Sequence, residues 1–134
     1  MANLDLGQFH VVVLHFPIVL FWTAFVYDIL GAFFKVNSYP AAHWFLMIAA
    51  ATAVPTVITG LLAFHFKADN PYVLIHRNWA LITFSFAFFY ALYRFYLLHK
   101  RSPGPKILLV ILSGITVLLI SITAEYGGKV AFGF

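Results

Sequence analysis

Long apolar runs recur along the chain, and they constrain its fold more than any other feature of the sequence. Four segments carry few charges and are each close to 20 residues or longer: 11–34, 41–64, 79–98 and 107–124. A helix of this length crosses roughly 30 Å of hydrocarbon, and its backbone hydrogen bonds are satisfied within the segment, as lipid requires. Turn-forming residues separate the segments in "FKVNSYP", "KADNPY" and "HKRSPGP". The sequence therefore predicts an all-α fold, an integral membrane four-helix up-and-down bundle.

The composition agrees with a lipid environment and excludes several kinds of site. Of 134 residues, 63% are hydrophobic and only 9% are charged, which is too little charge for a water-soluble surface. No linker or low-complexity tract divides the chain, so residues 1–134 are expected to form a single domain. The absence of cysteine rules out disulfides, iron-sulfur clusters and covalent c-type haem attachment. No nucleic-acid surface and no nucleophile with its base can be recognised, so an independent enzyme is not expected.

The basic residues predict how the bundle is oriented. One side of the predicted topology carries Lys35, Arg94, Lys100, Arg101 and Lys106, and the other carries Lys67, Arg77 and Lys129. Basic residues collect on the cytoplasmic side, so both termini are expected to face the periplasm of a bacterial inner membrane. The first segment is interpreted as a retained helix and not as a cleaved signal peptide. Arg94 is expected to extend to the interface, and Lys35 is a candidate partner for Asp28.

His76 precedes the third apolar segment, and helical phase predicts where it points. Phenylalanines cover the other faces of that helix, and small or polar side chains recur on the face of His76, at Ala80, Thr83, Ala87 and Tyr90. Helices in lipid pack through small residues and present bulky apolar residues to the acyl chains. We therefore expect His76 to point into the bundle.

On the first segment, His15 is the histidine that we expect to act as a ligand. It shares a helical face with Val19 and Trp22, and Trp22 is a candidate for contact with a cofactor, with simple packing as the alternative. His10 lies on a different face, that of Asp28, and nearer to water. It is a second choice, as a ligand of a second haem, as a hydrogen-bonding neighbour of the ligands, or as a contact to a haem propionate.

The remaining histidines are less distinctive. His65, near the end of the second segment, is also a second-choice ligand, with an interfacial position as the alternative. His43 and His99 are expected to lie at the cytoplasmic membrane interface, bonded to water or headgroups.

Neutral imidazoles from different helices around an apolar, aromatic core suit bis-histidine haem b. Each Nε2 can donate to iron from one side, and the core of a four-helix bundle is a common place for such a site. His15 and His76 are the expected iron ligands, and one haem or two would fit the number of histidines. Zinc or copper remains an alternative, although the carboxylate, sulfur or methionine partners that these metals use are scarce here. A quinone as a further bound group is left open.

Four stretches together resemble a bacterial family of small four-helix membrane proteins, long catalogued as a domain of unknown function. They are "HVVVLHFPIVL", "PTVITGLL", "HRNWALITF" and "AEYGGKVAFGF", and the resemblance covers essentially the whole chain. The residues that match the family motifs are His10, His15, Phe16, Pro17, Thr59, Gly60, His76, Tyr126, Gly127 and Gly128. The resemblance implies a four-helix membrane fold and a b-type haem electron carrier associated with redox partners.

These observations lead to a functional hypothesis with alternatives. The protein is expected to bind haem b and to pass electrons within the lipid bilayer, as a subunit or partner of a respiratory or photosynthetic redox complex. A cofactor-free structural or assembly subunit is the first alternative, a small channel or transporter is a less favoured one, and a homo-oligomer is left open. Tyr126, Gly127 and Gly128 are expected to fold back as a turn near the histidines, because paired glycines permit unusual backbone conformations.

Overall fold

A computed structural model describes residues 5–64 and 69–133 of the chain. The described residues form four long α-helices: α1 (Leu6–Phe33), α2 (Tyr39–Phe64), α3 (Pro71–His99) and α4 (Lys106–Phe132). All four are long and apolar enough to cross a membrane. The predicted all-α membrane bundle is confirmed.

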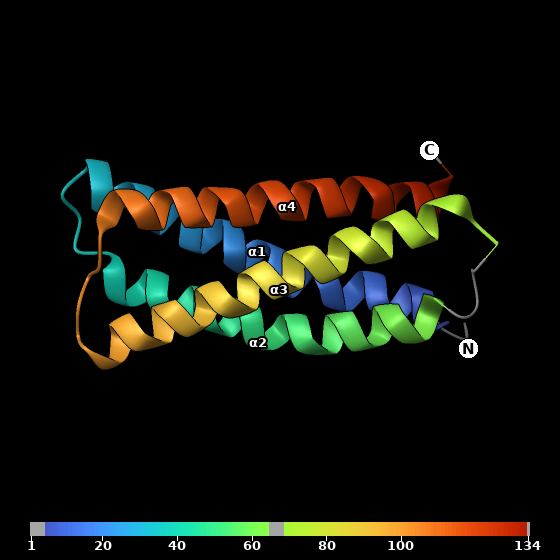
Figure 1. Cartoon of the computed structure of the whole chain (residues 1–134), viewed down its shortest axis with the longest axis horizontal. Coiled ribbons are helices and arrows are strands. Elements are labelled where there is room, and N and C mark those ends of the chain that lie inside the picture. The colour runs from blue at the N-terminus through green and yellow to red at the C-terminus, as the bar shows by residue number, and fades with distance from the viewer. Residues whose placement is uncertain (1–4, 65–68, 134) are drawn as a thin grey trace.

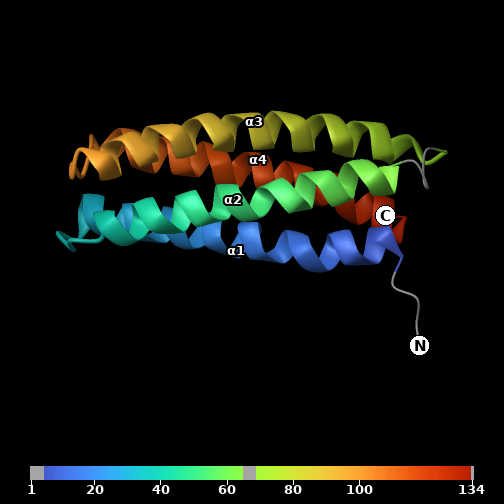
Figure 2. The ribbon, with the colours of Figure 1, turned by 90° about the horizontal axis from the view of Figure 1, so that it is seen from below.

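The helices run alternately up and down, so that both termini lie at the same end of the bundle (Figure 1). Helix α1 packs against α2 and α4, and α3 packs against the same two helices. The view in Figure 2 accordingly separates α3 from α1, with α2 and α4 between them. Helices α1 and α3 are therefore diagonal neighbours across the centre of the bundle.

Three helix ends extend beyond the apolar segments, because individual capping residues rather than hydrophobicity determine where these helices begin or end. Asp5 caps α1 by accepting a hydrogen bond from the backbone N–H of Gln8 at 2.7 Å. Asn70 caps α3, whose first residue is Pro71, so this helix begins well before the expected start at residue 79. Helix α4 continues past residue 124 to Phe132 and is capped by Gly133, which is left-handed with φ of 77°.

The side chains sort by face as the lipid environment requires. On α3 the expected inward residues Thr83, Ala87 and Tyr90 are buried, whereas Phe89 is 69% exposed. Large exposed apolar side chains occur on all four helices. In water such surfaces would be costly, but a bilayer of similar polarity covers them without penalty.

Candidate functional site

Two polar centres lie inside this apolar bundle, one near each end. We call the end with both chain termini the terminal end, and the end with residues 34–38 and 100–105 the loop end. His10 and His76 meet near the terminal end, and Asp28 and Arg94 meet near the loop end. His10 and Asp28 are both on α1, and their sequence separation corresponds to about 27 Å along a helix. The two centres are thus separated by nearly the thickness of the hydrocarbon core.

His10 and His76 bring two imidazoles together across the diagonal of the bundle. Their ring centroids are 6.4 Å apart, and the ring planes are inclined by 73°. Both side chains are partly buried. Because α1 and α3 are diagonal, each imidazole reaches toward the centre between α2 and α4.

Hydrogen bonds assign the same tautomer to both of these histidines. His76 Nδ1–H donates to the carbonyl oxygen of Thr123 at 2.9 Å. His10 Nδ1 lies 3.1 Å from Thr59 Oγ1, and that hydroxyl already donates its own hydrogen to backbone carbonyls of α2, so it accepts from His10 Nδ1–H. In each neutral ring Nε2 therefore keeps its lone pair, and it has no hydrogen-bond partner among the described residues.

A glycine of a neighbouring helix backs each imidazole. A Cβ atom on Gly60 of α2 would lie 2.9 Å from His10 Cε1, and one on Gly127 of α4 would lie 3.0 Å from His76 Cε1. Both distances are shorter than a normal carbon–carbon contact. The glycines let each ring pack directly against the backbone, which fixes the positions of both rings.

Arg77 follows His76 in the chain and carries one nitrogen without a hydrogen-bond partner in the described part of the chain, although its Nη2 donates to Asn78 Oδ1 at 3.2 Å. Its guanidinium carbon lies 5.0 Å from the centroid of the Phe64 ring, so the side chain reaches from α3 to α2. Among the described residues, its Nε is the only buried side-chain nitrogen or oxygen without a hydrogen-bond partner. Such groups are rare in folded proteins and often face a water, ion or ligand.

His15, the first-choice ligand of α1, does not face His76. It is exposed, and its Nδ1 donates to the carbonyl oxygen of Val11, in the preceding turn, at 2.6 Å. Val19 and Trp22, on the same face, are also exposed, so this face of α1 points to lipid and Trp22 lies away from the bundle centre. The histidine of α1 that the structure brings to His76 is His10.

The expected turn at the C-terminal glycines is wrong. Tyr126, Gly127 and Gly128 all lie within α4, which runs on to Phe132. Gly127 does contact His76, through the close packing that a helix permits when a residue has no side chain. Tyr126 is partly buried, and its ring lies 4.8 Å from the amine of Lys129. His65 falls outside the described residues.

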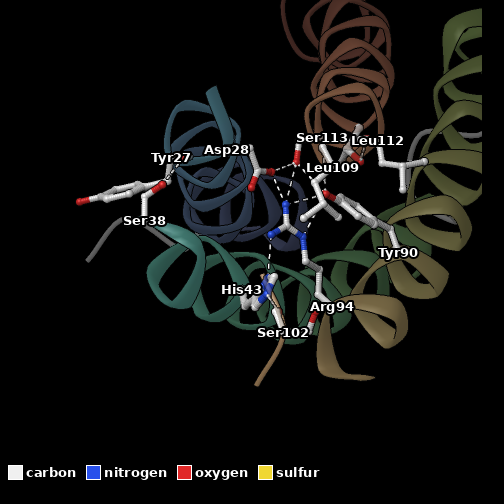
Figure 3. A network of polar contacts seen from close by, with 11 residues as sticks. Tyr27, Asp28, Ser38, His43, Tyr90, Arg94, Ser102, Leu109, Leu112 and Ser113 are labelled. Carbon is white, nitrogen blue, oxygen red and sulfur yellow. Dashed lines mark hydrogen bonds and ion pairs between the residues drawn. The ribbon is translucent and has the colours of Figure 1, made fainter. Parts of the chain in front are cut away.

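Near the loop end, a charged network occupies the centre of the bundle (Figure 3). Arg94 is 0% exposed and forms an ion pair with Asp28, and Ser113 donates a hydrogen bond to the same carboxylate. The hydroxyl of Tyr90 accepts from Arg94 Nε at 3.0 Å and donates to the carbonyl oxygen of Leu109 at 3.1 Å. Side chains of α1, α3 and α4 are thereby joined around one guanidinium.

His43 of α2 completes this network and carries the opposite tautomer. Arg94 is always a donor, so His43 Nδ1 accepts from Arg94 Nη1 at 2.7 Å. His43 Nε2–H then donates to the carbonyl oxygen of Ser102 at 3.1 Å. Both nitrogens are occupied, which leaves His43 no lone pair for a metal.

The sequence interpretation of these charges needs correction. Arg94 does not extend to the interface, and Asp28 is compensated by Arg94 rather than by Lys35. His43 is fully buried instead of lying at the interface, whereas His99 is exposed as expected. An ion pair inside an apolar core compensates both charges, so neither side chain has to reach water.

Side chains that could bind a metal do not gather in large clusters in the described part of the chain. Within residues 5–64 and 69–133, no cluster of three or more His, Cys, Asp or Glu side chains forms a metal site. The zinc and copper alternatives would therefore need a donor outside those ranges.

Comparison with protein families gives a match over residues 8–134, to a family described as predicted membrane protein (DUF2231). No curated protein and no solved structure shows significant similarity to the chain.

Proposed function

The chain belongs to this family of predicted membrane proteins, and we propose that it is a b-type haem protein in which His10 and His76 are the axial ligands. His10 takes the place that the sequence analysis gave to His15. When bound, haem b supplies a one-electron iron centre.

The separation of the two imidazoles is the observation that carries the proposal. A metal ion bound by two imidazoles lies about 2 Å from each nitrogen. Since each nitrogen is about 1 Å from its ring centroid, two rings that share one metal have centroids roughly 6 Å apart. The 6.4 Å between His10 and His76 fits this arrangement.

The hydrogen bonds of the Nδ1 atoms support the same assignment. Histidine ligands of metals almost always donate their other N–H to a carbonyl, a carboxylate or water, which fixes the ring and makes the coordinating nitrogen more basic. His76 has such a bond to Thr123, and His10 has one to Thr59. Both rings are thus held as neutral imidazoles whose Nε2 atoms have no hydrogen-bond partner among the described residues.

Arg77 fits the acidic edge of a haem. The two propionates of haem b are anionic, and the unsatisfied Nε of Arg77 lies one residue from His76 at the terminal end. A guanidinium is well suited to pair with a carboxylate. Arg77 is therefore the residue that we expect to contact a propionate.

We further propose that the terminal end faces the periplasm of a bacterial inner membrane. With Arg94 and Asp28 paired, the loop end carries four basic residues without an acidic partner in the described structure: Lys35, Lys100, Arg101 and Lys106. Such an excess of basic residues favours a cytoplasmic loop end. The histidine pair would then hold its redox group near the outer leaflet, within reach of a quinone or of another membrane redox subunit.

An optical spectrum of the purified protein tests the proposed function. The protein is expressed with an adequate haem supply, extracted in mild detergent, and measured as isolated and after reduction with dithionite. We expect a Soret band and a sharp α band typical of six-coordinate haem b. If the folded protein has neither band and does not bind added haem, the proposal is wrong, and the histidines serve only to join helices.

A further inference from the structure

A cavity at the loop end is independent of the histidine site. It has a volume of about 220 Å³ and lies where the end of α1, the loop 34–38 and the starts of α2 and α4 meet. Because one water occupies about 30 Å³, it could hold roughly seven waters or one small polar group. Its lining includes Lys35, Lys106, Tyr27, Asn37 and Tyr39.

The charges around this cavity are unbalanced. Asp28 also lines it, but that carboxylate is already paired with Arg94. The other three acidic residues, Asp5, Asp69 and Glu125, belong to the terminal end. Across the described residues no carboxylate oxygen lies within 4.0 Å of the amine of either Lys35 or Lys106. Two exposed lysines without an acidic partner among these residues therefore line one cavity, and an anion bound there would be attracted by both charges.

The backbone holds Lys35 in place at some energetic cost. Its φ is 56°, in the left-handed region that side chains other than glycine rarely adopt. Ser38 helps to fix this turn, because its hydroxyl donates to the carbonyl oxygen of Tyr27 at 2.6 Å. Both Tyr27 and Ser38 lie beside the charged network in Figure 3. A glycine would adopt this backbone conformation with less strain, but the lysine adds a positive charge to the cavity.

Exposed apolar side chains surround the two lysines. Phe34 and Val36 flank Lys35, and Ile107 follows Lys106; all three are exposed. A free anion gains nothing from this surface, whereas the acyl chains of a lipid would cover it. Basic pockets between transmembrane helices are known to bind anionic lipid headgroups.

We propose that this cavity binds the phosphate of an anionic phospholipid, with Lys35 and Lys106 as the charged contacts. Inorganic phosphate carries the same charged group, but the exposed apolar residues beside the lysines favour a lipid over a free ion. The site would fasten α1, α2 and α4 together at the loop end. It does not depend on whether the protein binds haem.

The test compares lipid affinity and thermal stability of the full chain in bilayer discs. Wild-type protein is placed in phosphatidylcholine, in phosphatidylcholine with phosphatidylglycerol, and in phosphatidylcholine with inorganic phosphate. We expect phosphatidylglycerol alone to raise the melting temperature. In Lys35→Gln/Lys106→Gln we expect the affinity for phosphatidylglycerol to fall about 100-fold, since each direct hydrogen bond to a charged phosphate contributes about tenfold.

The matched control removes the same charge at the same end. Lys100 and Arg101 are exposed and do not line the cavity. Lys100→Gln/Arg101→Gln should keep the phosphatidylglycerol response within about twofold of wild type, as expected for screened surface charges. Equal losses of phosphatidylglycerol affinity in the two double variants would show that general surface charge causes the effect, and would overturn the proposed site. Stabilisation by inorganic phosphate, without any by phosphatidylglycerol, would overturn the lipid assignment.

Discussion

The imidazole rings of His10 and His76 lie with their centroids 6.4 Å apart, although the two residues belong to helices that are diagonal in the bundle. Neither ring hydrogen-bonds to the other. Each instead donates its Nδ1–H to a neighbouring helix, to Thr59 on α2 and to Thr123 on α4. All four helices therefore contribute to the position of two free Nε2 atoms.

Gly127, which packs against the His76 ring, should tolerate substitution less well than the neighbouring Gly128. Gly128 has no heavy atom within 4 Å of a built Cβ, so Gly128→Ala should stabilise α4 by up to about 1 kcal/mol. In Gly127→Ala the new methyl group would displace the His76 ring from Thr123, and we expect a loss of roughly 1–3 kcal/mol, typical of overpacking. Thermal unfolding in detergent measures both effects. Equal stability of the two variants would show that His76 does not depend on Gly127.

The ion pair between Asp28 and Arg94 should behave as a coupled unit. Asp28→Leu or Arg94→Met alone leaves one buried charge without its partner, which costs about 3–5 kcal/mol. The double variant removes both charges and should be clearly more stable than the sum of the two single losses predicts. Denaturant unfolding of the four proteins measures the coupling. Additive losses would mean that the two charges do not stabilise each other.

The chain contains no cysteine, which makes orientation easy to test. Single cysteines at two exposed positions, Ala131→Cys and Arg101→Cys, report on the terminal and the loop end. In intact cells a membrane-impermeant maleimide should label Ala131→Cys and not Arg101→Cys. The opposite pattern would place the histidine pair at the cytoplasmic face.

The fold could be predicted from the sequence because lipid imposes simple rules on a chain. Apolar runs of spanning length leave a helix bundle as the main option, and the small face of the third helix correctly indicated which of its residues are buried. The helix ends were missed because they depend on single capping residues, Asp5, Asn70 and Gly133, outside or at the edge of the apolar runs.

The same packing rule could have selected the histidine of α1. Val19 and Trp22, on the face of His15, are bulky and apolar, which is typical of a lipid-facing surface. The face of His10 instead leads to Ala24 and Asp28, and both are buried. A small residue followed by a charge in mid-helix is the signal that this face points inward.

The ion-pair partner of Asp28 could not be predicted from the packing rule. Asp28 and Arg94 are 66 positions apart in the sequence. Lys35 is a nearer candidate partner for Asp28, and Arg94 lies close enough to the end of its apolar segment to extend to the interface. Only the packing of α1 against its neighbours brings them together. His43 was missed for the same reason, since its burial depends on Arg94 and on the loop carbonyl of Ser102.

The reduced optical spectrum of four histidine variants tests the central claim most directly. His10→Ala and His76→Ala should each lose the low-spin b-type α band, and added imidazole should restore part of it, because the free ligand replaces the missing ring. His15→Ala should keep the wild-type spectrum, since that side chain is exposed and points to lipid. His43→Ala should also keep it, because His43 uses both nitrogens in the network at the other end. Loss of the band in His15→Ala together with its retention in His10→Ala would contradict the assignment of His10 and His76 as the ligand pair.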